Sequence, residues 1–217
     1  NVGSIINKGV EFEFDAQVVK AGDFSFELYG NVSENRDEVL RLAQDAAGND
    51  INLDNSYYTT RVGYPQGQFY LRTWGGVDPA DGRPYYIVGG DHRDGPVSEE
   101  VTYSLFSAEQ TVQGLRLPPI QGGLGLRLKW KQLSLDGNLM FQTGHKVFER
   151  WAWYTMASGL RSVRTFAGDA RLMDRWQKPG DITDVPKMVY TSGSTLAGSG
   201  TSSRFLYDGD FMRVRDI

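Results

Sequence analysis

Three carboxylates near the start of the sequence are the best candidates for catalytic residues, judged by residue type and spacing. Glu11, Glu13 and Asp15 alternate with apolar residues, and a glycoside hydrolase uses a pair of carboxylates as acid and as base or nucleophile. Alternation along an extended strand produces the same spacing, and a strand face turned to water is expected to be charged. We interpret the three as a polar strand face and predict that the protein is not an enzyme.

Four aspartates in a later connecting segment are the best candidates for calcium ligands. Their spacing does not match the acidic positions, glycine and terminal glutamate of an EF-hand loop. The sequence also has no cysteine, which excludes thiolate metal sites and disulfides. We interpret the four as turn residues and predict no metal site: Asp78, Asp81, Asp91 and Asp94.

The histidines and one glycine-rich segment offer no catalytic group either. His92 and His145 each stand alone, so a zinc site or a Ser-His-Asp nucleophile has little support, and both are interpreted as loop surface. Residues 122–125 resemble a phosphate-binding loop but lead into a strand, without the lysine, serine and helix of that motif. The sequence predicts no catalytic residue and no cofactor.

Aromatic side chains in or beside the long connecting segments are the best candidates for ligand contacts. Their rings can stack on sugars or peptide side chains, but loop aromatics also pack the loop itself. The sequence therefore assigns no ligand-binding residue. The candidates are Trp74, Tyr85, Tyr86, Trp151, Trp153 and Tyr154.

The overall composition narrows the class of protein. A formal net charge of -4 and a pI near 5.2 give no basic footprint for nucleic acid. No apolar run approaches the roughly 18 residues of a membrane helix. A mean hydropathy of -0.43 is ordinary for a soluble protein, but barrel strands put only alternate residues into lipid and also have ordinary hydropathy.

Strict alternation of apolar and polar residues predicts the central structural unit at residues 123–144. Leu124, Leu126, Leu128 and Trp130 share one face, and the segment that follows Lys131 repeats the pattern. This predicts an antiparallel hairpin closed near residues 131–132. A second hairpin of the same kind is predicted from residues 10–18 and 24–32, around a glycine-containing turn.

The remaining segments carry weaker signals. Residues 34–56 lose the alternation and are interpreted mainly as loop, with a short helical turn possible at residues 39–47. A third hairpin is predicted from residues 58–64 and 68–74. A short helix is expected within residues 148–156 and a flexible stretch at residues 193–203. Two closing strands are expected at residues 205–207 and 211–217.

Short and long connections alternate along the chain, and this regularity decides the predicted fold class. Outer-membrane barrels have short turns on one side and long loops on the other, whereas sandwiches rarely segregate connection lengths in this way. We predict an all-β fold of antiparallel strands, part of a large, unclosed outer-membrane β-barrel with long extracellular loops. Aromatic residues near strand ends fit an interfacial girdle: Phe24, Tyr58, Tyr64, Trp74, Trp130 and Phe141.

Five fragments of the sequence, taken in order, are similar to one protein family. They are NVGSIINKGVEFEF, GGVDPADGRPYY, PPIQGGLGLRLKWKQLSLDGNLMFQTGHKVF, DRWQKPGDITDVPK and SSRFLYDGDFMRVRDI. In order and rough spacing they resemble the C-terminal barrel portion of SusC/RagA-type TonB-dependent outer-membrane transporters of Bacteroidetes. The resemblance covers nearly the whole chain, but its motifs are strand and turn signatures rather than ligand contacts.

The resemblance implies a nutrient import channel in the cell outer membrane. Such a transporter has a barrel of about 22 strands, a plug contacted by TonB, and a SusD-like surface lipoprotein partner. It imports glycans or peptides with energy from the proton-motive force. Residues 1–217 are expected to be a partial barrel domain without the plug and final strands, and therefore unable to transport alone.

This interpretation assigns the two strand faces and leaves two alternatives open. Phe12, Phe26, Leu126 and Leu139 are expected to face lipid, and Glu13, Glu27, Arg127 and Asn138 to face the lumen. A secreted carbohydrate-binding β-sandwich would share the alternation and the aromatic loops. A glycoside hydrolase would use a carboxylate pair.

Overall fold

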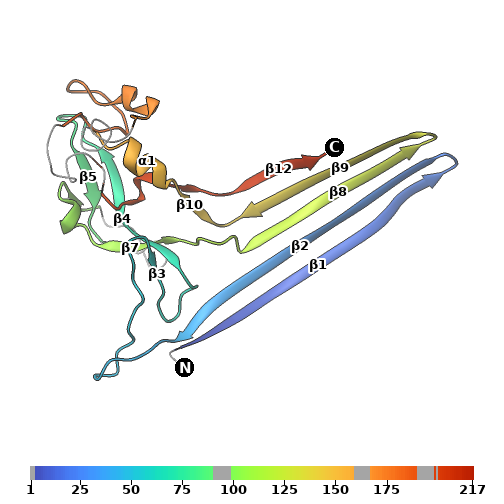
Figure 1. The fold of residues 1–217 in the computed structure, drawn as a ribbon, viewed down its shortest axis with the longest axis horizontal. Helices are drawn as coiled ribbons and strands as arrows, with labels where there is room; N and C mark the ends of the chain where they lie inside the picture. The colour runs from blue at the N-terminus through green and yellow to red at the C-terminus, as the bar shows by residue number, and fades with distance from the viewer. Residues whose placement is uncertain (1–2, 90–98, 159–166, 190–197, 199) are drawn as a thin grey trace.

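The computed structural model describes residues 3–89, 99–158, 167–189, 198 and 200–217. A long five-stranded sheet extends away from a compact group of short strands and helical turns (Figure 1). We call these two parts the wall sheet and the outer subdomain. Within the described ranges, no helix is long and apolar enough to cross a membrane.

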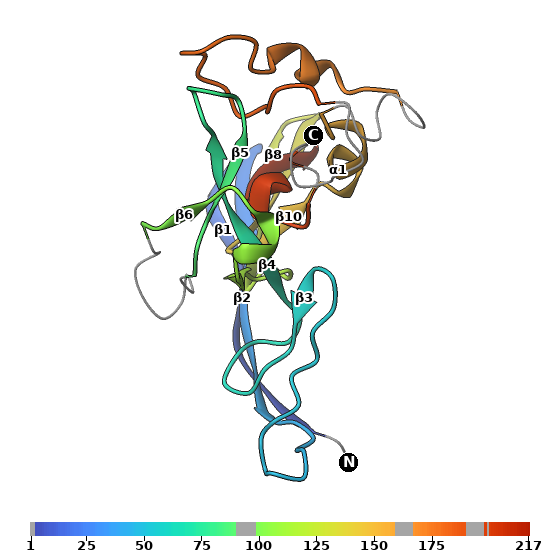
Figure 2. The same ribbon diagram turned by 90° about the vertical axis from the view of Figure 1, so that its left-hand side faces the viewer.

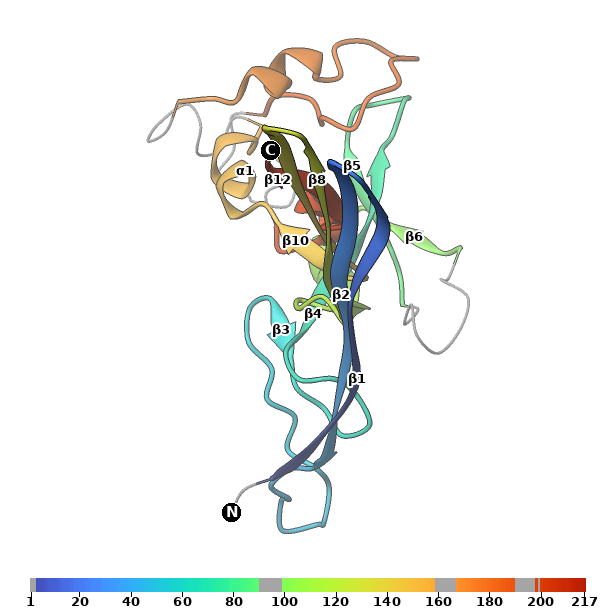
Figure 3. The same cartoon turned by 90° about the vertical axis from the view of Figure 1, so that its right-hand side faces the viewer.

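The wall sheet is entirely antiparallel, with the strand order β1-β2-β8-β9-β12. Viewed from the end that carries the short turns, it is a single curved layer (Figure 3). Its strands are β1 (Ser4–Ala21), β2 (Phe24–Arg41), β8 (Ile120–Trp130), β9 (Leu133–Thr143) and β12 (Phe211–Asp216).

Two tight turns close the hairpins of the wall sheet at the same end (Figure 1). Gly22 adopts a φ of 55° between β1 and β2, and Lys131 adopts the same φ between β8 and β9. The backbone N–H of Lys131 donates to the carbonyl of Asp23 at 3.0 Å, which ties the two turns together. Both strongly alternating hairpins of the sequence are therefore confirmed.

The strand register keeps the two sets of side chains in phase across the sheet. Leu126 lies opposite Leu28 of β2 and Gly137 of β9. Arg127, the next residue, lies opposite Glu27 and Asp136. Since directly paired residues of neighbouring strands point to the same face, the apolar residues form one continuous surface and the polar residues form the other.

The first hairpin is longer than the sequence predicts. Residues 34–41, expected to be loop, continue β2, and β1 begins at Ser4. The helical turn expected from residue 39 is also wrong, because Val39 is a buried strand residue that accepts a hydrogen bond from Gly63 and donates to Tyr64. Strands of 18 residues span about 60 Å, far more than an apolar band of about 25 Å. The parts of β1 and β2 beyond such a band do not alternate between apolar and polar residues.

The two long connections of the wall sheet fold together into the outer subdomain (Figure 2). Residues between β2 and β8 form a second sheet with the order β3-β4-β5-β6, and β7 pairs with β4. Its strands are β3 (Tyr58–Thr59), β4 (Gln68–Val77), β5 (Pro84–Ile87), β6 (Val101–Thr102) and β7 (Gln110–Gly114), and the 3-10 helix η1 (Leu105–Ser107) lies between β6 and β7.

The second long connection, between β9 and β12, adds one small sheet and three helical segments. The strands are β10 (Lys146–Phe148) and β11 (Leu206–Asp208), and the helical segments are α1 (Arg150–Thr155), η2 (Ala170–Asp174) and η3 (Ser203–Phe205). The short helix expected within residues 148–156 is confirmed by α1. Most of residues 193–203 lie outside the described ranges, but Ser202 is fully buried, so that part of the expected flexible stretch is packed.

The third predicted hairpin exists but lies in a different sheet. β3 has only two residues, and β4 pairs with β3, β5 and β7 rather than with any wall strand. Along β4, one face is buried and the other is half-buried at its centre, and no residue is exposed, unlike in a wall strand. The third hairpin is therefore not part of the wall sheet, and a single long connection joins β2 to β8.

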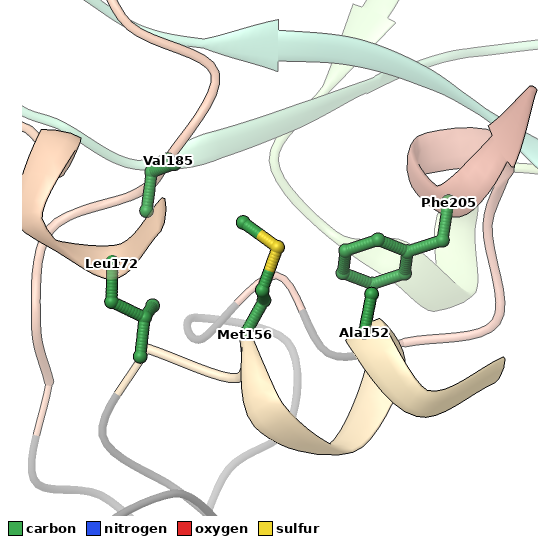
Figure 4. Close-up of a cluster of buried hydrophobic side chains, with 5 residues drawn as sticks. All are labelled: Ala152, Met156, Leu172, Val185 and Phe205. Atoms are coloured by element: carbon green, nitrogen blue, oxygen red, sulfur yellow. The ribbon is translucent and has the colours of Figure 1, made fainter. Parts of the chain in front are cut away.

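Two small hydrophobic cores hold the outer subdomain. One contains five buried side chains from α1 and the residue after it, from η2 and the segment after it, and from η3: Ala152, Met156, Leu172, Val185 and Phe205 (Figure 4). The other contains Tyr86, Leu105 and Ala108, with Trp74 packed against them. Trp74 and Tyr58 therefore belong to the outer subdomain and not to the aromatic girdle, whereas Phe24 and Trp130 pair beside the short turns as expected.

Two glycines of the wall hairpin differ in the space around them. A methyl group at Gly125 would overlap the Tyr29 ring, whereas one at Gly137 would meet only ordinary contacts with Leu126, the nearest at 3.7 Å. The Tyr29 ring thus occupies the space that a side chain at Gly125 would need.

We expect Gly125→Ala to destabilise the intact protein by about 1–3 kcal/mol, because the added methyl group must displace the Tyr29 ring. Gly137→Ala, on the facing strand, is the matched control and is expected to have little effect. Thermal unfolding of the purified protein in detergent measures both. Equal unfolding temperatures for the two variants would contradict the packing described here.

Candidate functional site

The apolar face of the wall sheet is exposed along its whole length. Phe12 is 59 % exposed, Leu133 67 % and Met212 70 %, on three different strands. Soluble monomers rarely expose apolar patches larger than a few hundred Å². No second sheet covers this face in the part of the chain that the structure describes, although a β-sandwich requires one. The face therefore needs an apolar environment from outside the chain.

The opposite face carries a network of polar side chains across four strands. The Arg127 guanidinium donates to Glu27 and to Asp136, each at 2.9 Å, and so joins β8 to β2 and β9. The Tyr29 hydroxyl donates to Oδ1 of Asn138 at 2.7 Å, and the Asn138 amide donates to Asp216 of β12 at 3.2 Å. Partly exposed ion pairs contribute little stability, so the network mainly fixes a hydrophilic surface.

The four face pairs expected from the sequence fall as predicted. Phe12, Phe26, Leu126 and Leu139 follow the apolar face, and their neighbours Glu13, Glu27, Arg127 and Asn138 follow the polar face. The polar face also contains a hollow of about 600 Å³, bordered by β1, β2, β8 and β9. This hollow is lined by side chains such as Glu13, Asn31 and Gln121 and by the edge of the Tyr29 network.

The three carboxylates with glycosidase-like spacing lie in a row on the polar face of β1. Glu11, Glu13 and Asp15 are exposed, and they lie opposite Ser33, Asn31 and Tyr29. None of these facing residues is a second carboxylate. The row therefore lacks the opposed acid and base of a glycoside hydrolase.

The aspartates considered as calcium ligands instead shape a turn between β4 and β5. Asp78 accepts a hydrogen bond from the Ala80 N–H at 2.8 Å, and Asp81 accepts one from the Arg83 N–H at 3.0 Å. The Tyr103 hydroxyl also donates to Asp78, which lowers the pKa of that carboxyl. Asp91 and Asp94 lie outside the described ranges. No group of three potential metal-ligating side chains occurs among the described residues.

One of the two histidines is not at the surface. His145 is buried between β9 and β10, where its imidazole lies against Gly209. The carbonyl of His145 also accepts a hydrogen bond from the Gly209 N–H at 2.9 Å. The expected exposed loop position is therefore wrong, because this residue packs where the wall sheet joins the outer subdomain. His92 lies outside the described ranges.

The six candidate aromatic residues differ in whether their rings are available. Tyr86 is fully buried, and burial raises the pKa of its hydroxyl to about 12. Trp74 packs edge-on against it with ring centroids 5.6 Å apart. Trp153 and Tyr154 contact each other at 4.6 Å, and only Trp151, at 72 % exposure, falls among the exposed residues of the six. The structure thus assigns most of these rings to packing.

A buried arginine that no sequence pattern singles out lies beside this aromatic core. Arg204 donates to the carbonyl of Gly198 at 3.0 Å, and its guanidinium lies 5.1 Å from the Trp74 ring and 4.9 Å from the Phe205 ring. Burial lowers the pKa of Arg204 to about 10. Nothing in the local sequence signals this role, because the residues around Arg204 come from both long connections.

Two fragments that are distant in sequence meet in the outer subdomain. The Trp176 indole N–H donates to the carbonyl of Pro79 at 3.0 Å, and the Gly180 N–H donates to the same residue at 2.8 Å. Gly82 lies against the Trp176 ring with no room for a side chain. The segments GGVDPADGRPYY and DRWQKPGDITDVPK therefore form one contact, which we call the Trp176 clamp.

Known proteins are similar to this chain in sequence and in structure. No family model matches. Two receptors of Formosa agariphila, TonB-dependent receptor P26 and TonB-dependent receptor P3, are each 23% identical over 232 residues, which cover 100% of this chain and 22% of the receptor. The chain therefore spans about a fifth of the length of the curated relatives it matches.

Solved structures are also similar to this chain over nearly its whole length. A structure of the RagAB peptide transporter matches with a TM-score of 0.78 and 27% identity, covering 98% of this chain and 22% of that chain. The RagAB peptide importer in its 'closed-closed' state matches with a TM-score of 0.79 and 26% identity, over 99% of this chain and 22% of that chain.

These comparisons confirm the resemblance to SusC/RagA-type TonB-dependent receptors that the sequence fragments indicate. They also confirm the fold class, an all-β, unclosed part of a large outer-membrane barrel. Because the relatives are receptors and transporters rather than enzymes, the prediction that the chain is not an enzyme is confirmed. The outer-membrane location is confirmed on the same grounds.

The two faces predict opposite effects of charge in the intact protein. Leu126→Arg is expected to cost about 2–4 kcal/mol of insertion free energy, because it places a cation in lipid. Arg127→Leu, one residue away, should leave insertion intact, since its two partner carboxylates remain partly exposed to water. The fraction of protein that folds into lipid vesicles measures the effect. Equal tolerance at both positions would contradict the assignment of faces.

Proposed function

We propose that this chain contributes part of the barrel wall and outer loops of a TonB-dependent importer in the outer membrane. The observation that carries the proposal is the match of 98% of the chain to a RagAB peptide transporter at a TM-score of 0.78. The continuous apolar face of the wall sheet supports it, because lipid is the environment that such a face requires.

The lengths of the connections orient the wall sheet in the membrane. Outer-membrane barrels place short turns in the periplasm and long loops outside the cell. The turns at Gly22 and Lys131 then face the periplasm, and the outer subdomain lies on the extracellular side. The polar face, with the Arg127 and Tyr29 networks, lines the lumen.

Residues 1–217 as a whole belong, in this proposal, to the barrel domain. The plug and the segment that contacts TonB would lie elsewhere in a complete receptor, since this chain spans 22% of its curated relatives. A SusD-like lipoprotein is the proposed surface partner, and a glycan or a peptide is the proposed substrate. The similarity to RagAB, a peptide transporter and importer, supports such an assembly and favours peptides.

Uptake by the source cells tests this function. Deletion of the gene that encodes the complete receptor is expected to abolish uptake of one class of labelled nutrient, either peptides or oligosaccharides. A protonophore is expected to abolish the same uptake in wild-type cells, because import by such a receptor draws on the proton-motive force. Re-expression of the receptor is the control and should restore uptake.

A tagged receptor purified from the outer membrane should also carry a surface lipoprotein with it. Undiminished uptake of both nutrient classes after deletion would refute the import function. Recovery of the receptor without any lipoprotein, with uptake intact, would refute only the proposed partner.

A further inference from the structure

A hollow of about 930 Å³ lies beside the outer halves of β1 and β2, where the wall sheet meets the outer subdomain. It forms because β2 continues beyond the point where its neighbour β8 begins. The Asn35 N–H still donates to the carbonyl of Pro119 at 2.8 Å, just before β8, whereas Val39 bonds to residues 63 and 64. Parts of the segments 63–68 and 112–119 complete the border. We call this hollow the outer groove.

The outer groove lies on the side of the wall sheet that carries the apolar face. Phe12 and Val32 are paired on the apolar face, and the register continues without a shift to the pair of Lys8 and Arg36. Since every second residue of a strand shares a face, Lys8 and Arg36 extend the apolar face outward. Most of the residues that β1 and β2 contribute to the groove belong to this set: Ile6, Lys8, Val10, Glu34, Arg36 and Glu38.

The height of the pair of Lys8 and Arg36 matches the edge of a lipid layer. The rows of the apolar face run from Phe24, beside the short turns, to Val10, which pairs with Glu34. Residues 24 and 34 are about 33 Å apart along a strand, or about 25 Å in height at a tilt of about 40°, which is the height of a typical apolar band. Lys8 and Arg36 form the next row, at the level of the lipid headgroups.

Two cations of the groove have no carboxylate partner. Lys8 lies directly opposite Arg36, and like charges in this position destabilise a strand pair. Glu34 neutralises Arg36, with 2.6 Å between Nη2 and Oε1, but Lys8 forms no ion pair with any described residue. The Arg116 guanidinium lies 5.1 Å from the Tyr58 ring and also has no ion pair within the described ranges.

The carboxylates of the groove leave these two cations available to an anion. Glu34 is bound to Arg36, and Asp37 accepts a hydrogen bond from the Gln66 N–H at 2.7 Å. Glu38 lies opposite Ile6, one row farther from the apolar band than Lys8. An anion at the level of Lys8 is therefore attracted by Lys8 and Arg116.

Apolar side chains border the groove beside these cations. Val10 and Leu117 are both exposed, and they line the groove together with Pro118 and Pro119. Leu117 directly follows Arg116 in the chain. Cations at headgroup level next to exposed apolar side chains fit an amphipathic anion. A lipid phosphate is such an anion, and basic pockets at the membrane surface bind lipid headgroups.

We propose that the outer groove binds the phosphorylated headgroup of a lipid in the outer leaflet. Lys8 and Arg116 bind the phosphate oxygens, and an acyl chain of the lipid lies against Val10 and Leu117. The proposal goes beyond import and rests only on the orientation of the wall sheet given under the proposed function.

The test measures lipid binding by the complete receptor, purified in detergent and freed of bound lipid, with native mass spectrometry. The probes are phosphatidic acid and diacylglycerol with identical acyl chains, because these two lipids differ only in the phosphate. The native receptor is expected to prefer phosphatidic acid. Lys8→Gln is expected to weaken phosphatidic acid binding about fivefold, the effect of one basic residue near an anionic headgroup. Arg116→Gln should have a similar effect.

The unfolding temperature separates this role from a structural one. Lys8→Gln removes a repulsion across the hairpin, so without lipid it should unfold at the same temperature as the native receptor or higher. Added phosphatidic acid should stabilise the native receptor more than the variant. Lys20→Gln is the matched control, because Lys20 is exposed on the same strand and does not line the groove. It should leave phosphatidic acid binding unchanged.

Equal phosphatidic acid binding by Lys8→Gln and the native receptor would overturn the site. Equal binding of diacylglycerol and phosphatidic acid would also overturn it, because the phosphate would then not be recognised. Displacement of phosphatidic acid by inorganic phosphate would assign the groove to a free anion and overturn the lipid. Phosphate-dependent lipid binding in a receptor that imports no nutrient would refute the import function and leave this site standing.

Discussion

The phase of the side chains across the wall sheet is the constraint on which the rest of this structure depends. Successive residues of a strand point to opposite faces, so a register slip of one residue would exchange the two surfaces. Leu28, Leu126 and Gly137 are held in one row, and Glu27, Arg127 and Asp136 in the next. An error in either row would place an ion-pair network in lipid. The short turns at Gly22 and Lys131 fix this register at one end of each hairpin.

The opposite end of the wall sheet carries long connections, and these have cores of their own. Long segments without internal structure are uncommon in folded proteins. Here the connections bury Tyr86, Leu105 and Ala108 in one cluster and residues of α1, η2 and η3 in another. The Arg171 guanidinium adds an ionic contact, donating to Glu149 and Asp169 at 2.8 Å each. Hydrogen bonds to these two carboxylates raise the pKa of Arg171, those to Asp169 contributing most.

The sequence alone predicts those strands of the fold whose two faces lie in different environments. The hairpin of β8 and β9 is predictable to the residue of its turn, because lipid on one side and water on the other impose strict alternation. The outer halves of β1 and β2 have mostly exposed or half-buried residues on both faces, so residues 34–41 carry no such pattern and resemble a loop. β4 resembles a wall strand in sequence because it is rich in apolar and aromatic residues, but tertiary packing leaves none of its residues exposed.

The candidate site can be predicted from sequence only in its broad chemistry. Alternation by itself places Glu13 and Arg127 on the polar face. The buried positions of His145, Arg204 and Gln68 depend on contacts between segments that are far apart in sequence. Gln68, for example, is 5 % exposed and lines a hollow together with residues near 35, 66 and 113. Such enclosure leaves no local pattern of residue types, so no motif identifies these side chains.

The Trp176 clamp has a mechanical consequence. It joins the connection between β2 and β8 to the connection between β9 and β12, and the Trp74 N–H, which donates to Ser203 at 3.0 Å, joins them a second time. Each connection is also continuous with two strands of the wall sheet. A force that pulls on one connection is therefore shared by the ends of four strands. The two connections are therefore expected to move together as one unit rather than as two separate flaps.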